Sequence, residues 1–141
     1  MKHYLVVFLL LSLLSCGTTG HMVFYNFDKP KYEVEKEILR VIKEDSSHKI
    51  PAKWKNCNQG DYFERIYIYF KDGPEELYQI GFTGDSTDWN HSSGSRLSLI
   101  GQFSGKWKFE RDLDQKEIDR ITKRVESEIL SKIKFEYYKT D

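Results

Sequence analysis

Four segments in the middle of the chain alternate apolar with polar side chains: 63–70, 77–83, 96–103 and 106–110. A period of two residues is typical of β-strands that bury one face. Turn-forming residues such as Gly73 and Pro74 separate the first two segments, which we expect to pair as a hairpin. Gly101 indicates a bulge or a close backbone approach within the third segment. The pattern predicts an antiparallel sheet of about four strands.

Helical spacing replaces this alternation on both sides of the predicted strands. A first apolar stripe follows Pro30 and fades at Asp45; it consists of Val34, Ile38, Val41 and Ile42. A second follows Asp114, a good N-cap, and runs to about Lys134; it consists of Ile118, Ile121, Val125, Ile129 and Ile133. We therefore expect an α+β fold with an N-terminal helix, the strands and a C-terminal helix, both helices packing on one sheet face.

Length and charge narrow the class of protein. A chain of 141 residues is suited to one domain, and 39% hydrophobic residues are enough for a packed core. Lysine and arginine number 22, as do aspartate and glutamate, so the formal net charge is zero. Nucleic-acid binders usually carry a broad basic field, so we expect no nucleic-acid partner. Residues 29–141 are predicted to form a single domain.

The N-terminus carries the features of an export signal. Lys2 precedes an apolar run over residues 4–14, which only Ser12 interrupts. At about 1.5 Å per residue this run is too short to cross a hydrocarbon core of about 30 Å, whereas its length suits a secretory signal peptide. The segment Leu13-Leu14-Ser15-Cys16-Gly17 that follows resembles the lipobox of bacterial lipoproteins.

This resemblance implies a location. In the lipoprotein family the signal peptide, here residues 1–15, is removed, and the thiol of the new first residue, here Cys16, carries a diacylglyceryl group that anchors the protein in a membrane. Residues 16–28 would form a tether. In similar lipoproteins an aspartate after the cysteine often retains the protein at the inner membrane, and Gly17 stands there instead. The resemblance therefore implies the periplasmic face of the outer membrane.

Two features are candidates for binding or modification sites. Four aromatic residues would form a recognition patch if they share a bare sheet face: Tyr67, Tyr69, Trp89 and Trp107. The alternative is that both faces of the sheet are packed. The segment Asp85-Ser86-Thr87 resembles the O-glycosylation site of exported Bacteroidetes proteins, which implies Ser86 as the acceptor.

No cofactor or metal site is expected from the sequence. Segment 84–95 is rich in oxygen donors, but Asp85, Asp88 and Asn90 lack the alternate spacing of a calcium loop. The histidines show no paired spacing for zinc. No catalytic cysteine motif surrounds Cys57, which we expect to be a buried and inert thiol.

These observations favour a non-catalytic, lipid-anchored envelope protein whose domain binds a protein or an envelope polymer. An immunity protein, an inhibitor of a toxin or lysozyme, and an accessory subunit are concrete forms of that role. The alternative function is that of a small hydrolase directed at the cell wall.

Overall fold

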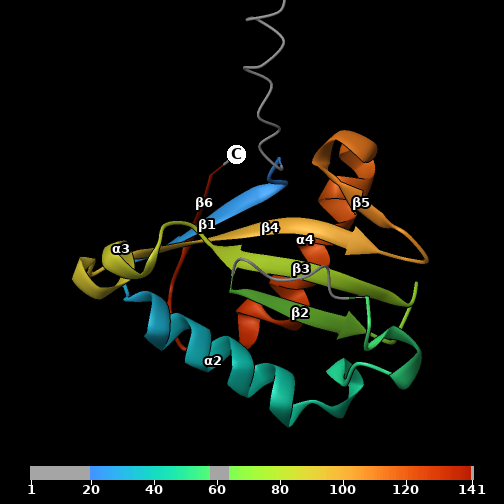
Figure 1. Cartoon of the computed structure of the whole chain (residues 1–141), viewed down its shortest axis with the longest axis horizontal. Helices are drawn as coiled ribbons and strands as arrows, with labels where there is room; N and C mark the ends of the chain where they lie inside the picture. The colour runs from blue at the N-terminus through green and yellow to red at the C-terminus, as the bar shows by residue number, and fades with distance from the viewer. Residues whose placement is uncertain (1–19, 58–63, 141) are drawn as a thin grey trace, which may run out of the picture.

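The computed structural model describes residues 20–57 and 64–140 (Figure 1). This part of the chain has a mixed α+β fold. Its strands and α-helices are β1 (Val23–Phe27), α2 (Lys31–Glu44), β2 (Arg65–Phe70), β3 (Glu76–Phe82), α3 (Ser86–His91), β4 (Ser95–Phe103), β5 (Trp107–Phe109), α4 (Gln115–Glu128) and β6 (Tyr138–Thr140). Short 3-10 helices connect them: η1 (Ser46–His48), η2 (Ala52–Trp54), η3 (Glu110–Asp112) and η4 (Leu130–Lys132).

One antiparallel sheet organises the domain. Its strand order is β2-β3-β4-β1-β6, and β5 pairs with β4 beside this path. The four predicted strands correspond to β2, β3, β4 and β5, and the predicted hairpin is the β2–β3 pair. The register of β3 against β4 shifts at Ile80, which faces Leu99, while Gln79 faces Gly101. The expected irregularity at Gly101 is therefore present, and a Cβ atom there would lie 3.0 Å from the Phe109 ring.

The tether predicted for residues 16–28 is wrong over β1. Residues 23–27 form an inner strand of the sheet, which pairs with β4 on one side and with β6 on the other. Tyr25 and Phe27 are buried in the core. The physical reason is a short alternation, since Val23, Tyr25 and Phe27 point inward and fill a gap that the four predicted strands leave open. With β6, the described residues have six strands, two more than predicted.

One hydrophobic core joins the sheet to the two long helices. Val34, Ile38 and Val41 of α2 and Ile121 and Val125 of α4 belong to the same buried cluster as the inward side chains of β1 to β4. The remaining helix, α3, lies within segment 84–95, where no helix was predicted. It buries none of its residues and lies at one end of the sheet (Figure 1). The predicted arrangement of helices is therefore found only in part.

Candidate functional site

A cavity lined by described residues lies at the end of the sheet beside α3. It has a volume of about 420 Å³ and opens to solvent. We call it the end cavity. It is lined by Asn26, Phe27 and Asp28 from the end of β1, Thr83 and Gly84 after β3, Asp88 and Trp89 of α3, Ser92, Gly94, Ser95 and Arg96 around the start of β4, and Tyr138 of β6.

Arg96 is the cation of this cavity, and its side chain is held in place. Its Nε–H donates to Oδ1 of Asn26 at 2.8 Å, and its guanidinium lies 5.2 Å from the centre of the Phe24 ring. The Asn26 amide is fixed in turn, because its Nδ2 donates to Oγ1 of Thr140 at 3.1 Å and to the carbonyl of Tyr138 at 3.4 Å. Within the described part of the chain, the two terminal guanidinium nitrogens of Arg96 have no hydrogen-bond partner.

The hydroxyl group of Ser95, which precedes Arg96 and lies on the core side of β4, is also unsatisfied. Oγ of Ser95 is enclosed, and no described residue offers it a hydrogen bond. An enclosed polar atom without a partner costs about 1–3 kcal/mol. Ser95 is one of four residues with such an atom in the described part of the chain. Two carboxylates share the cavity. Oδ2 of Asp88 accepts from the backbone N–H of Asp85 at 3.1 Å, whereas Asp28 is exposed and forms no ion pair with a described residue.

Three of the four predicted patch residues do come together. Tyr67, Tyr69 and Trp107 lie on the side of the sheet opposite the core, where they join Trp54 and Phe103. We call these five residues the aromatic cluster. Ring centres are 5.5 Å apart in the Trp54–Tyr69, Trp54–Phe103 and Phe103–Trp107 pairs and 6.0 Å apart between Tyr67 and Trp107. Edge-to-face contacts at these distances stabilise a packed cluster.

The polar atoms of the aromatic cluster are used inside the protein. The Trp107 indole N–H donates to the carbonyl of Cys57 at 2.9 Å, and the Tyr69 hydroxyl donates to the Glu75 carboxylate. That hydrogen bond, together with burial and the charge of Glu75, raises the pKa of Tyr69 to about 12. Tyr69 is 6% exposed, and the other members are half-buried. The cluster therefore attaches the η2 loop and β5 to the sheet, as in the alternative reading of two packed faces.

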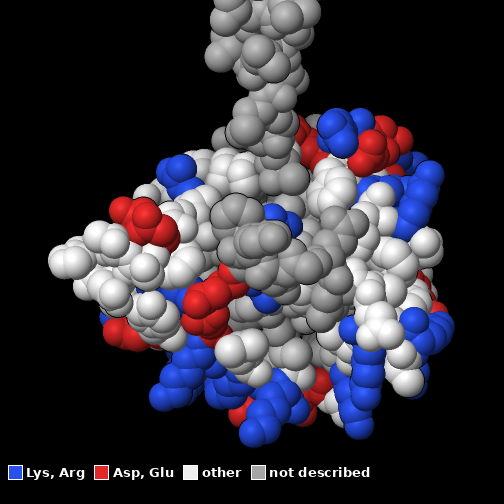
Figure 2. Space-filling view, viewed as in Figure 1, with Lys and Arg blue, Asp and Glu red and all other residues white. Residues whose placement is uncertain are grey.

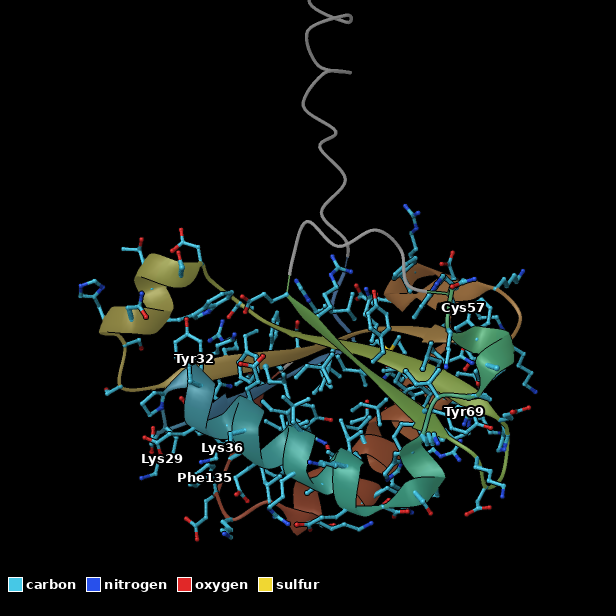
Figure 3. All side chains as sticks on the ribbon, turned by 60° about the horizontal axis from the view of Figure 1, so that its bottom comes forward. Lys29, Tyr32, Lys36, Cys57, Tyr69 and Phe135 are labelled. Atoms are coloured by element: carbon cyan, nitrogen blue, oxygen red, sulfur yellow. The ribbon has the colours of Figure 1, made fainter. Side chains whose placement is uncertain are left out.

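Trp89, the fourth predicted patch residue, is elsewhere. It lies in α3, and its indole N–H donates to the carbonyl of Thr83 at 2.9 Å. Its ring lies 4.4 Å from the ammonium of Lys31, which is also 4.7 Å from the ring of Tyr32. In Figure 3, Tyr32 lies at the opposite end of the domain from Tyr69 and Cys57. The prediction of one patch containing all four aromatic residues is therefore wrong.

Lys31 is a buried cation with a complete set of partners. It is 2% exposed, and its ammonium pairs with Glu35 at 3.0 Å and with Glu64. Burial by itself lowers the pKa of Lys31, but the hydrogen bonds to Glu64 and Glu35 outweigh it, so the pKa is raised overall. The ammonium stays charged and connects α2 to α3 through the Trp89 ring.

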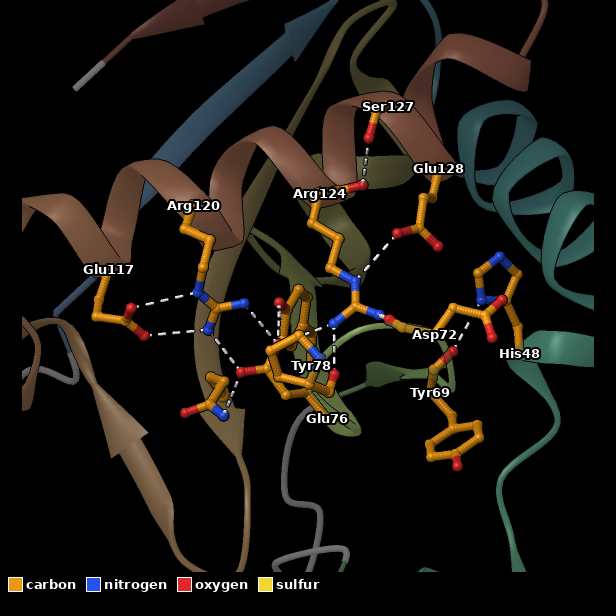
Figure 4. A network of polar contacts seen from close by, with 12 residues as sticks. His48, Tyr69, Asp72, Glu76, Tyr78, Glu117, Arg120, Arg124, Ser127 and Glu128 are labelled. Carbon is orange, nitrogen blue, oxygen red and sulfur yellow. Dashed lines mark hydrogen bonds and ion pairs between the residues drawn. The ribbon is translucent and has the colours of Figure 1, made fainter.

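A second buried charge network fastens α4 to the β2–β3 hairpin (Figure 4). The Glu76 carboxylate receives Arg120 at 2.6 Å and Arg124 at 3.0 Å. It also accepts from the Tyr78 hydroxyl at 2.6 Å and from the Gln102 amide at 3.0 Å. Burial would raise the pKa of Glu76, yet these donors and the two guanidinium charges lower it. A carboxylate held ionised and fully bonded in this way is suited to a structural role rather than to proton transfer.

The other predicted residues are placed as follows. Ser86 is the exposed first residue of α3, next to the N-cap Asp85, and glycosylation there stays a prediction. Cys16 lies outside the described residues. Cys57 is a free thiol and is half-buried, so the expectation of a buried thiol is not met in full.

The described residues form neither a metal site nor a membrane span. They contain no group of three or more metal-ligating side chains, and none of their helices is long and apolar enough to cross a membrane. Basic and acidic side chains are interspersed on the described part of the face in Figure 2. Comparisons with protein-family models, curated proteins and solved structures find no match for the chain.

Proposed function

We propose that this protein is a lipid-anchored binding protein of the bacterial cell envelope, held at the periplasmic face of the outer membrane by acyl chains on Cys16. The observation that carries the proposal is the lipobox-like segment 13–17, directly after an apolar run of signal-peptide length. Each buried methylene contributes about 0.8 kcal/mol, so two or three acyl chains hold a protein on a membrane stably.

The start of the folded domain supports this location. Four peptide units separate Cys16 from Gly20, the first described residue. They reach at most about 14 Å when fully extended. An acylated Cys16 would therefore keep Gly20 close to the bilayer. The end cavity includes residues 26–28, at the far end of β1, and a five-residue strand spans about 17 Å. The cavity would thus stay accessible from the aqueous side.

The charge pattern inside the domain supports binding rather than catalysis. Glu76 and Lys31 are the buried carboxylate and ammonium with the fullest sets of partners, and each is held charged by groups of opposite sign. Arg96 differs, because it lines an open cavity and no described residue accepts a hydrogen bond from its two terminal nitrogens. Unused donors on a fixed side chain suit the recognition of a ligand.

Fractionation of cells that produce the full chain tests the anchor. We expect the wild-type protein in the outer-membrane fraction and a Cys16→Ser variant in the soluble periplasmic fraction. Equal distribution of both proteins would contradict the proposal. Incubation of the purified protein with peptidoglycan tests the binding role. Stoichiometric co-sedimentation, or capture of an envelope protein, supports binding, whereas release of soluble fragments with turnover supports the alternative hydrolase.

A further inference from the structure

We infer that the end cavity binds the zwitterionic group of an α-amino acid, with its carboxylate on Arg96 and its ammonium on Asp28. This inference gives the proposed binding role a ligand class and rests on that role. It follows from the donors that the protein leaves unused, from the charges that line the cavity, and from the size and apolar side of the cavity.

The unused donors indicate a planar anion. A guanidinium offers five N–H donors in a rigid fork, and this geometry matches the two oxygens of a carboxylate. Arg96 uses its Nε–H for Asn26 and keeps the N–H groups of both terminal nitrogens, for which no described residue is an acceptor. Because Asn26 and the Phe24 ring hold the guanidinium, little freedom is lost when a ligand binds.

The remaining charges argue against a simple anion. Asp28 and Asp88 line the same cavity, so its formal charge with Arg96 is negative rather than positive. Phosphate or sulfate would meet two carboxylates of like charge. A ligand that carries an ammonium next to its carboxylate satisfies both signs. Asp28 is the available acceptor, since Asp88 already caps α3.

The cavity also has room and apolar surface for a side chain. Its volume of about 420 Å³ lies in the range of small-molecule sites. Trp89 and Tyr138 contribute aromatic surface to its lining. A free amino acid with an apolar side chain therefore fits better than glycine. Leucine is the probe that follows from this chemistry.

Tryptophan indole signals provide the measurement. The chain has three tryptophans, and ¹⁵N labelling of their side chains gives one indole signal each in NMR spectra of the full-length mature protein. Trp89 lines the end cavity, while Trp54 and Trp107 belong to the aromatic cluster and serve as internal controls. Addition of leucine should move the Trp89 signal saturably and leave the other two in place. Acetate and methylammonium, which each carry one of the two charges, should bind at least tenfold more weakly.

Variants assign the contacts. Arg96→Gln should weaken leucine binding at least tenfold, by loss of the donors described above. Arg96→Lys keeps the positive charge but loses the planar guanidinium, so its affinity for leucine should lie between those of wild type and Arg96→Gln. Lys123→Gln, which alters an exposed residue of α4, should bind leucine like wild type. Unchanged thermal melting of each variant shows that the fold is intact.

Three results would overturn the inference. The first is the absence of any shift of the Trp89 signal at millimolar leucine, and the second is equal leucine binding by wild type and Arg96→Gln. The third is acetate binding as tight as leucine binding, which would refute the role of Asp28. The leucine titration measures binding to the folded domain, whether or not Cys16 is modified. Loss of this ligand would therefore leave the proposed anchor standing, and an unmodified Cys16 would leave the ligand site standing.

Discussion

Replacing Glu76 by glutamine removes the negative charge at the centre of the network between α4 and the β2–β3 hairpin. Glutamine has nearly the same shape, so the change leaves the packing in place and isolates the charge. Glu76 is 2% exposed, and its partners Arg124 and Arg120 are 8% and about one-third exposed. The variant therefore removes the carboxylate that one buried and one half-buried guanidinium share.

The expected loss of stability follows from this burial. Breaking a buried ion pair by removing one partner costs about 3–5 kcal/mol. The low end applies to Glu76→Gln, because Arg120 keeps its contact with Glu117 and Arg124 keeps its contact with Glu128. For a domain of this size 1 kcal/mol corresponds to about 4 °C in Tm. We therefore expect a free energy of unfolding lower by about 3 kcal/mol and a Tm lower by about 12 °C at pH 7.

Calorimetry and urea titration of both proteins measure this difference. Glu117→Gln is the matched control, because it removes a carboxylate from the same Arg120 at a position that is 44% exposed. An exposed ion pair contributes at most about 1 kcal/mol, so the control should melt within about 4 °C of wild type. Equal losses in the two variants, or a loss below 1 kcal/mol in Glu76→Gln, would refute the assigned role of the network.

The difference in stability between wild type and Glu76→Gln should depend on pH in a defined direction. The folded pKa of Glu76 lies below its ordinary value of 4.5, so the stability that its charge contributes is fully present above pH 4.5. That stability is lost as the pH falls through the lowered pKa. The difference in Tm between wild type and Glu76→Gln should therefore be constant near neutral pH and should shrink in acid. A difference that grows as the pH falls would contradict the direction of the shift.

Three further predictions concern β1, the Lys31 site and the aromatic cluster. Because β1 is an inner strand, Tyr25→Ala should lower the free energy of unfolding in urea by about 3–5 kcal/mol. Tyr138→Ala in the exposed β6 should change it by less than about 1 kcal/mol. Equally small losses of stability in both variants would show that residues 23–27 behave as a tether. Lys31→Met should lower the free energy of unfolding by about 1–2 kcal/mol. It should also alter the fluorescence of Trp89, since it removes a cation 4.4 Å from the indole ring. An unchanged fluorescence spectrum would exclude that contact. The Tyr69 phenol should titrate near pH 12 in NMR spectra rather than near pH 10. The stability that its hydrogen bond contributes is therefore present below pH 10 and is lost as the pH approaches 12. Titration near pH 10 would contradict the hydrogen bond to Glu75.

Local periodicity predicted the elements that are long and regular. The alternation in β2, β3 and β4 and the apolar stripes of α2 and α4 are repeated often enough to stand out from the loops. The two missed strands are short and pair with distant parts of the chain. β1 has five residues, and its partner β4 lies about 70 positions further on. The six-residue helix α3 was missed because one and a half turns carry no repeated apolar spacing.

The candidate sites show a sharper limit of sequence reasoning. Alternation correctly placed Tyr67 and Tyr69 on the side away from the core. It could not show that Trp54, from a separate loop, packs onto Tyr69 and makes that side a second packed layer. The end cavity is formed by the ends of four strands and by one short helix, so no contiguous sequence motif predicts it.

The mass of the native protein tests the lipid anchor most directly. The protein should be purified from membranes of its own organism in detergent, and its N-terminal peptide should be sequenced by tandem mass spectrometry. We predict a chain that begins at Cys16 and carries a thioether-linked diacylglyceryl group on Sγ, with residues 1–15 absent. A chain that still carries residues 1–15, or one that has an unmodified Cys16 thiol, would contradict the proposed anchor and the location inferred from it.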